Sequence, residues 1–141
     1  MFEQPIVAFE PGKGFDLVGA DIFVEEKEPE GVFIAARNLV KDFAKVTGSG
    51  GNAVISERRS PTKSKSVIII GSVPQSSTIR SLHDGRSIDT TPIEGKWESW
   101  MTTCVANPFE GYDNALVIAG SDKRGTIFGI YSLCEQIGVS P

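Results

Sequence analysis

The sequence predicts an α/β (α+β) fold, in which helices pack against a mixed β-sheet. Two continuous apolar runs, at 67–70 and 115–119, are typical of strands buried on both faces. Strands alternate with helices in the second half of the chain, whereas the start reads as hairpin-forming strands, and this combination favours a mixed sheet. The 141 residues are 40% hydrophobic and 23% charged, which indicates one globular domain spanning 1–141.

The first 24 residues read as extended chain. Ile6–Phe9 is a short apolar run that ends at Pro11-Gly12, and a second apolar segment spans Phe15–Val24. We predict that the two segments pair as a hairpin through the Pro-Gly-Lys-Gly turn between them.

An acidic run follows, with Glu25, Glu26, Glu28 and Glu30 around Pro29. Clustered carboxylates can act as general acids and bases. The sequence favours a different interpretation, a solvated turn that places negative charge at the amino end of the next helix, where the helix dipole stabilises it.

A helix is predicted over Gly31–Val46, because apolar residues recur along one face of this segment. The glycine-rich residues at 48–51 end it. They follow a helix, whereas phosphate-binding loops follow a strand, so we interpret them as a flexible connection. Asn52–Ser56 is a predicted short strand, and the basic residues between 58 and 65 are typical of an exposed loop.

The middle of the chain is predicted to form a strand and a short helix. β-branched residues fill Ser66–Gly71, which favours a strand. Ser76–His83 is the helix, with Ile79 and Leu82 facing inward. His83 is the only histidine of the chain, and at a helix carboxyl end we expect it to interact with the terminal carbonyl groups.

A further strand is predicted at Trp97–Ala106, with a hairpin connection at 109–114 leading into the last strand. Alternation places Trp97 and Trp100 on opposite faces of this strand. One tryptophan is therefore expected in the core. The other could stack on a sugar ring or be covered by a neighbouring domain.

The last quarter of the chain, from Ala115 to Pro141, reads as a buried strand, a tight polar turn and a covering helix. Ser121 or Asp122 is predicted to cap the helix. Gly125 and Gly129 each cost about 1 kcal/mol of helix propensity relative to Ala. We expect close approach of the helix to the sheet to offset that cost. The predicted apolar face consists of Ile127, Ile130, Cys134 and Ile137, and Gly138 is the predicted helix stop.

Composition argues against several classes of function. A net charge of −4 is unlike a general nucleic-acid binder, and no stretch reaches the roughly 20 apolar residues of a membrane span. No basic-then-apolar signal peptide is visible at the amino terminus. Cys104 and Cys134 read as two buried free thiols. Two cysteines and one histidine lack metal-ligand spacing, so no metal site and no cofactor are predicted.

The segment GSDKRGTIFGIYSLCEQIGVSP at 120–141 closely resembles the end of the N-terminal domain of glycoside hydrolase family 115, the xylan α-glucuronidases. Val67–Gly71 and Ile93–Glu98 resemble the same domain in the same order, and GVFIAARNLVKDFAKVTG at 31–48 fits its pattern more weakly. Ser132 and Cys134 depart from the family pattern, in which an acidic residue and a serine are expected.

The resemblance implies that residues 1–141 are a single N-terminal accessory domain, like those that precede the barrels of hexosaminidases and other α-glucuronidases. A catalytic TIM barrel, absent here, would follow it and be its partner. The full-length enzyme would release 4-O-methylglucuronic acid from xylan and would be secreted. The domain itself is expected to be non-catalytic, and its contact with glucuronoxylan stays open.

No catalytic residue is predicted in this chain. Gly120–Thr126 resembles a phosphate loop without its lysine, so nucleotide hydrolysis is not expected. Ser121, Asp122, Lys123 and Arg124 remain as candidates for substrate binding, through a helix amino terminus that accepts anions, or for pairing with the following domain. The alternative function is a stand-alone carbohydrate-binding or protein-interaction module.

Overall fold

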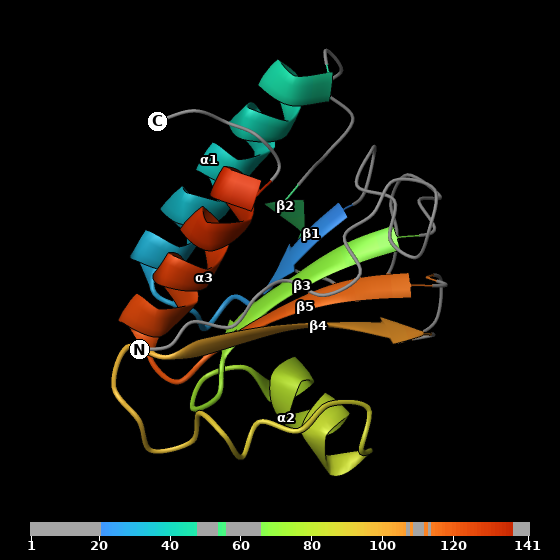
Figure 1. The fold of residues 1–141 in the computed structure, drawn as a ribbon, viewed down its shortest axis with the longest axis vertical. Coiled ribbons are helices and arrows are strands. Elements are labelled where there is room, and N and C mark those ends of the chain that lie inside the picture. Colours follow the sequence, from blue (N-terminus) through green and yellow to red (C-terminus); the bar gives the residue numbers. More distant parts are fainter. Residues whose placement is uncertain are drawn as a thin grey trace.

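The computed structural model describes residues 21–47, 54–55, 66–106, 108, 112 and 114–136. These residues form a five-stranded mixed sheet in the order β2-β1-β3-β5-β4 (Figure 1). The strands are β1 (Asp21–Val24), β2 (Val54–Ile55), β3 (Ser66–Ser72), β4 (Trp100–Ala106) and β5 (Asn114–Gly120). Every pairing is parallel except that of β4 with β5, which is antiparallel. The predicted mixed sheet is thereby confirmed.

Helices cover both faces of this sheet. The helices α1 (Glu30–Thr47) and α3 (Lys123–Gln136) lie side by side on one face, and α2 (Ser77–Asp84) lies on the other (Figure 1). All three match the predicted helices to within two residues where the structure describes them. The helix stop proposed at Gly138 and most of the hairpin proposed between Ile6–Phe9 and Phe15–Val24 lie outside the described residues. Asp21–Val24, the described part of that hairpin, is β1 and pairs with β2 and β3 instead.

The core is divided by the sheet into two layers, because successive strand residues point to opposite faces. Ile68, Ile70 and Ile118 face α1 and α3, whereas Val67, Ile69 and Val117 face α2. All six are fully buried. This explains why β3 and β5 read as continuous apolar runs, since a central parallel strand is covered on both sides.

The glycines of α3 allow that helix to lie directly on β5 and on the residues before β4. A Cβ atom at Gly129 would lie 2.7 Å from Cγ2 of Ile118 and 3.1 Å from Cδ1 of Trp100. At Gly125 it would overlap the carbonyl oxygen of Ser99. The predicted close approach is confirmed, and it accounts for two residues that otherwise weaken a helix.

Candidate functional site

The parallel strands β1, β3 and β5 end at the same edge of the sheet, and polar side chains gather there. In open α/β sheets this edge is where ligands and partners commonly bind. β3 and β5 end in register, with Ser72 opposite Gly120. The four candidate residues at 121–124 follow β5 directly, so the structure places them at this edge.

Ser121 and Asp122 are both engaged with the segment that leads into β4. The N–H of Ser99 donates to Ser121 Oγ at 3.0 Å, and the N–H of Ser121 donates to the Ser99 carbonyl at 2.8 Å. Asp122 Oδ2 accepts from the N–H of Glu98 at 3.0 Å, while Oδ1 accepts from the N–H of Gly125 at 2.7 Å. Asp122 is therefore the helix cap, as one of the two predicted alternatives had it.

Arg124 also has a partner within the chain. Its Nη1 lies 2.7 Å from Oε2 of Glu98 in an exposed ion pair. Lys123 is exposed, and its aliphatic stem lies near Gly31 of α1. The turn thus joins α3 to the residues before β4. Its role in binding a substrate or a following domain stays a prediction.

The two tryptophans differ sharply in environment. Trp97 is 85% exposed. Trp100 is half-buried, and its ring packs edge-on against Phe128 of α3 with 6.3 Å between centroids. The predicted strand beginning at Trp97 is wrong by three residues, because Gly95 and Glu98 adopt positive φ and place Trp97 in a loop. The expectation of one core tryptophan and one on the surface is met only in part, because Trp97 is exposed but Trp100 is half-buried rather than in the core.

The interpretation of the acidic run as a solvated turn is wrong for two of its residues. Glu28 is buried and accepts hydrogen bonds from the backbone N–H and the hydroxyl of Ser72, both at 3.0 Å. Glu25 accepts four hydrogen bonds from Ser77 and Thr78, at 2.6–3.1 Å, at the amino end of α2. The carboxylates therefore tie β1 to β3 and α2.

These environments shift the pKa values of the two carboxyl groups in opposite directions. Burial raises the pKa of Glu28 above its ordinary value, and the hydrogen bonds from Ser72 offset only part of this effect. Burial also acts to raise the pKa of Glu25, but the hydrogen bonds from Thr78 and Ser77 outweigh it, so that this pKa is lowered. Glu25 is thus held as the anion, close to the positive end of α2.

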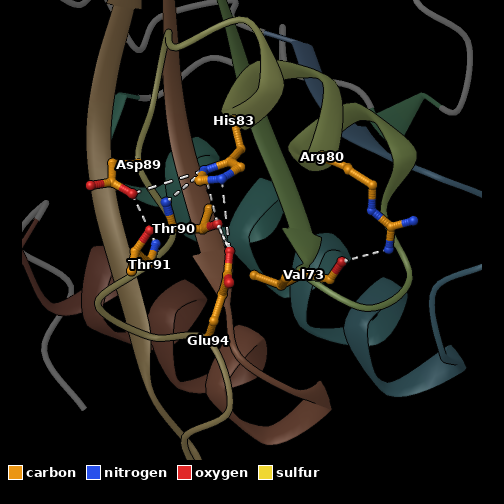
Figure 2. Close-up of polar contacts among 7 residues, drawn as sticks. All are labelled: Val73, Arg80, His83, Asp89, Thr90, Thr91 and Glu94. Carbon is orange, nitrogen blue, oxygen red and sulfur yellow. Dashed lines mark hydrogen bonds and ion pairs between the residues drawn. The ribbon is translucent and has the colours of Figure 1, made fainter.

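The carboxyl end of α2 carries a second polar group, drawn in Figure 2. His83 Nδ1 lies 3.2 Å from the backbone nitrogen of Thr90, which donates to it. The Thr90 hydroxyl donates to Glu94 Oε2 at 2.6 Å, and the N–H of Thr91 donates to Asp89 Oδ1 at 3.0 Å. The expectation that His83 binds helix carbonyl groups is wrong, because the ring nitrogen acts as an acceptor.

A groove of about 770 Å³ lies beside this group. It runs between the end of α2, the turn that follows it, and β4, and we call it the α2–β4 groove. Its lining includes His83, Arg86, Asp89, Met101 and Thr103. No motif in the sequence indicates it, because its two sides, at 83–89 and 101–103, are separated in the chain by an irregular connection.

The cysteines are free thiols, as predicted, but only Cys134 is buried. Cys104 is exposed on β4, which corrects the prediction for that residue.

Among the described residues, no group of three potential ligands could hold a metal ion. The helices within the described ranges are all too short or too polar to span a membrane.

Comparison with known proteins gives matches by structure. No protein-family model matches the chain, and no curated protein matches it significantly. A solved structure of a family GH115 4-O-methyl-α-glucuronidase with specificity for decorated arabinogalactans is similar, with a TM-score of 0.64 and 24% identity over 86% of this chain. CpGH84D is similar with a TM-score of 0.53 and 13% identity, also over 86% of this chain.

The chain spans only a small part of each of these proteins. It covers 14% of the α-glucuronidase chain and 18% of CpGH84D. At these identities the similarity shows a shared fold. The fold of this chain is thus one that occurs as a segment within larger glycoside hydrolase chains.

Proposed function

We propose that the chain is a non-catalytic accessory domain of a glycoside hydrolase related to the xylan α-1,2-glucuronidases of family 115. The observation that carries this proposal is the fold match, which extends over most of this chain and over a small segment of an α-glucuronidase. In the full-length enzyme, the domain would precede the TIM barrel that releases 4-O-methylglucuronic acid from xylan. Nucleic acids and membranes are not among its proposed partners.

The carboxyl groups at the candidate edge support a non-catalytic role. Glycoside hydrolysis requires two carboxyl groups flanking the scissile bond, about 5–9.5 Å apart and free to act on substrate. Glu25 and Glu28 are instead bound to residues of α2 and β3, and Asp122 caps α3. Glu98 is paired with Arg124. These groups hold the fold together.

We assign the contact with the catalytic domain to the surface around Trp97. An indole that is 85% exposed is unusual for a residue of this size. Its neighbour Glu98 is fixed by Asp122 and Arg124, so the loop that presents Trp97 is anchored. Lys123 and Arg124 would supply polar contacts at the margin, in keeping with the mixed character of interfaces between domains.

The test is an activity assay on the isolated chain and on a fusion to a family 115 barrel. Incubation of the isolated chain with glucuronoxylan is expected to release no uronic acid, whereas the fusion should release it. In the fusion, Trp97→Ala should lower the melting temperature of the barrel, and Ile34→Ala, at an exposed apolar residue of α1, is the matched control. Release of uronic acid by the isolated chain, abolished by a single substitution in it, would contradict the proposal.

The exposure of Trp97 also favours the second candidate, a stand-alone carbohydrate-binding module. An exposed indole offers a flat apolar surface on which a pyranose ring can stack. In that case, oligosaccharides should quench the fluorescence of Trp97 in the isolated chain, and Trp97→Ala should abolish retention on immobilised xylan. Retention without this dependence on Trp97 would exclude the indole as the binding platform.

A further inference from the structure

The α2–β4 groove contains polar groups that the fold does not use. Arg86 lines it, and within the described part of the chain its guanidinium makes no hydrogen bond or ion pair. Asp89 also lines the groove, and its exposed carboxylate accepts hydrogen bonds from Thr91. Hydrogen bonds from the Thr91 side chain and backbone lower the pKa of Asp89, so the carboxylate is ionised at neutral pH.

Arg86 occupies a backbone position that suits another residue better. The N–H of Arg86 donates to the His83 carbonyl at 3.0 Å, and the N–H of Ser87 donates to the Leu82 carbonyl at 2.9 Å. This is the hydrogen-bond pattern of a helix end whose C′ residue is left-handed and is usually glycine. Arg86 has φ of 65°, whereas the glycine of this turn, Gly85, has φ of −81°. An arginine is thus held where a side chain is unfavourable.

His83 also lines this groove, and its ring carries a hydrogen-bond donor on the side of Glu94 (Figure 2). The hydroxyl hydrogen of Thr90 is engaged with Glu94, and the backbone N–H of Thr90 points to His83 Nδ1 (Figure 2). Nδ1 is therefore the acceptor, and in the neutral ring the hydrogen resides on Nε2. Nε2 lies 4.0 Å from Glu94, beyond hydrogen-bond distance, so the donor is not satisfied by that carboxylate.

We propose that the α2–β4 groove binds a neutral saccharide unit through its hydroxyl groups. Two carboxylates, Asp84 and Asp89, and one guanidinium line the groove, so an anion would meet more negative than positive charge. Among the described residues, no group of three potential ligands could hold a metal ion there. Sugar hydroxyl groups both donate and accept. They can accept from Arg86 and His83 and donate to Asp89, while Met101 contacts the apolar edge of the ring.

The proposal rests on the proposed function only for the kind of sugar, namely the neutral backbone of the polysaccharide whose uronic acid branches the barrel would remove. The groove would hold that backbone away from the Trp97 surface. Because the two sites lie on different elements, a failed titration of the groove leaves the accessory-domain proposal standing. Release of uronic acid by the isolated chain would refute the accessory-domain proposal but would not bear on the proposal that the groove binds a saccharide.

The test is a titration of the ¹⁵N-labelled chain with xylohexaose and, separately, with a neutral galacto-oligosaccharide. At least one of the two should shift the amide signals of Arg86, Asp89 and Thr103 in a saturable manner. Arg86→Gly should weaken this binding at least tenfold without lowering the melting temperature. Arg86→Lys should recover part of it, because charge is restored without the planar fork.

Arg80→Ala is the matched control. Arg80 is an exposed arginine of α2, and its guanidinium donates to the Val73 carbonyl and is turned away from His83 (Figure 2). The Arg80→Ala variant should bind the oligosaccharide with the same affinity as the parent chain. Absence of saturable shifts with both sugars, shifts confined to Trp97, or equal loss in Arg86→Gly and Arg80→Ala would each overturn the proposal.

Discussion

The turn at 121–124 and the α2–β4 groove both gather polar side chains, but they use them differently. In the turn, Ser121, Asp122 and Arg124 each bind the segment before β4. In the groove, the Arg86 side chain has no partner among the described residues, and His83 Nε2 lies 4.0 Å from Glu94, too far for a direct hydrogen bond. Residue type alone pointed to the turn, whereas the pairing of polar groups points to the groove. Substitutions in the two regions should separate polar groups that stabilise the fold from polar groups left for a ligand.

The largest expected effect is at the contact beneath the turn. Gly125→Ala places a methyl group on the carbonyl oxygen of Ser99, and backbone cannot move aside as a side chain can. The free energy of unfolding should fall by about 3 kcal/mol, at the upper end of overpacking costs. Urea unfolding monitored by circular dichroism measures the loss. Gly95→Ala, where a Cβ meets nothing within 4 Å, is the control; its cost is limited to the strain of a side chain at φ of 75°, about 1–2 kcal/mol.

The next effect concerns the cap of α3. Asp122→Ala removes the acceptor for the N–H groups of Gly125 and Glu98. Loss of an N-cap side chain costs about 0.5–2 kcal/mol, and the second lost hydrogen bond places the effect near the upper value. Asp122→Asn retains one acceptor and should recover part of the stability. An unchanged free energy of unfolding in Asp122→Ala would mean that the Asp122 side chain does not stabilise the fold.

Arg86→Gly tests whether a polar residue of the α2–β4 groove stabilises the fold. Glycine adopts the left-handed conformation without the strain of a side chain, so the free energy of unfolding should rise by about 1 kcal/mol. Thermal unfolding is the measurement. A clear loss of stability would show that the guanidinium supports the fold, and that Arg86 resembles Arg124 after all.

The smallest effects are pH-dependent and involve Glu25 and Glu28. The folded-state pKa of Glu25 is lowered, so its contribution to stability is present above its unfolded-state pKa and disappears as the pH falls through the folded-state pKa. Glu25→Gln should therefore be less stable than the parent chain at pH 7, by a margin that shrinks in acid.

Glu28 should behave in the opposite sense. Its folded-state pKa is raised, so ionised Glu28 opposes folding increasingly as the pH rises through the interval between its unfolded-state and folded-state pKa values. The stability of Glu28→Gln relative to the parent chain should rise with pH across that interval. Urea unfolding at several pH values between about 3 and 7 tests both variants. If the stabilities of Glu25→Gln and Glu28→Gln relative to the parent chain changed with pH in the same direction, the opposite pKa shifts of the two residues would be contradicted.

Local patterns were enough to predict much of the fold. β3 and β5 are continuous apolar runs because they are buried on both faces, and α3 carries its glycines where it touches β5. The cap at Asp122 follows from the residues beside it in sequence. In each case the physical cause lies within a few residues of the signal.

The sequence could not predict contacts whose partners are distant along the chain. Glu25 and Glu28 read as solvated because Thr78 and Ser72 lie 53 and 44 residues away. Alternation predicts a strand at Trp97 because it carries no sign of the positive φ at Glu98. The α2–β4 groove exists only once β4 is paired beside β5, which brings Met101 and Thr103 to the end of α2.

The most direct measurement pairs two variants in two assays, urea unfolding and xylohexaose titration, with the galacto-oligosaccharide replacing xylohexaose if it is the sugar that binds. We predict that Asp122→Ala loses stability and keeps the affinity of the parent chain for the oligosaccharide. Arg86→Gly should keep or gain stability and lose at least tenfold in affinity. Loss of stability in Arg86→Gly together with loss of affinity in Asp122→Ala would contradict the account, because the turn would then serve the ligand and the groove would serve the fold.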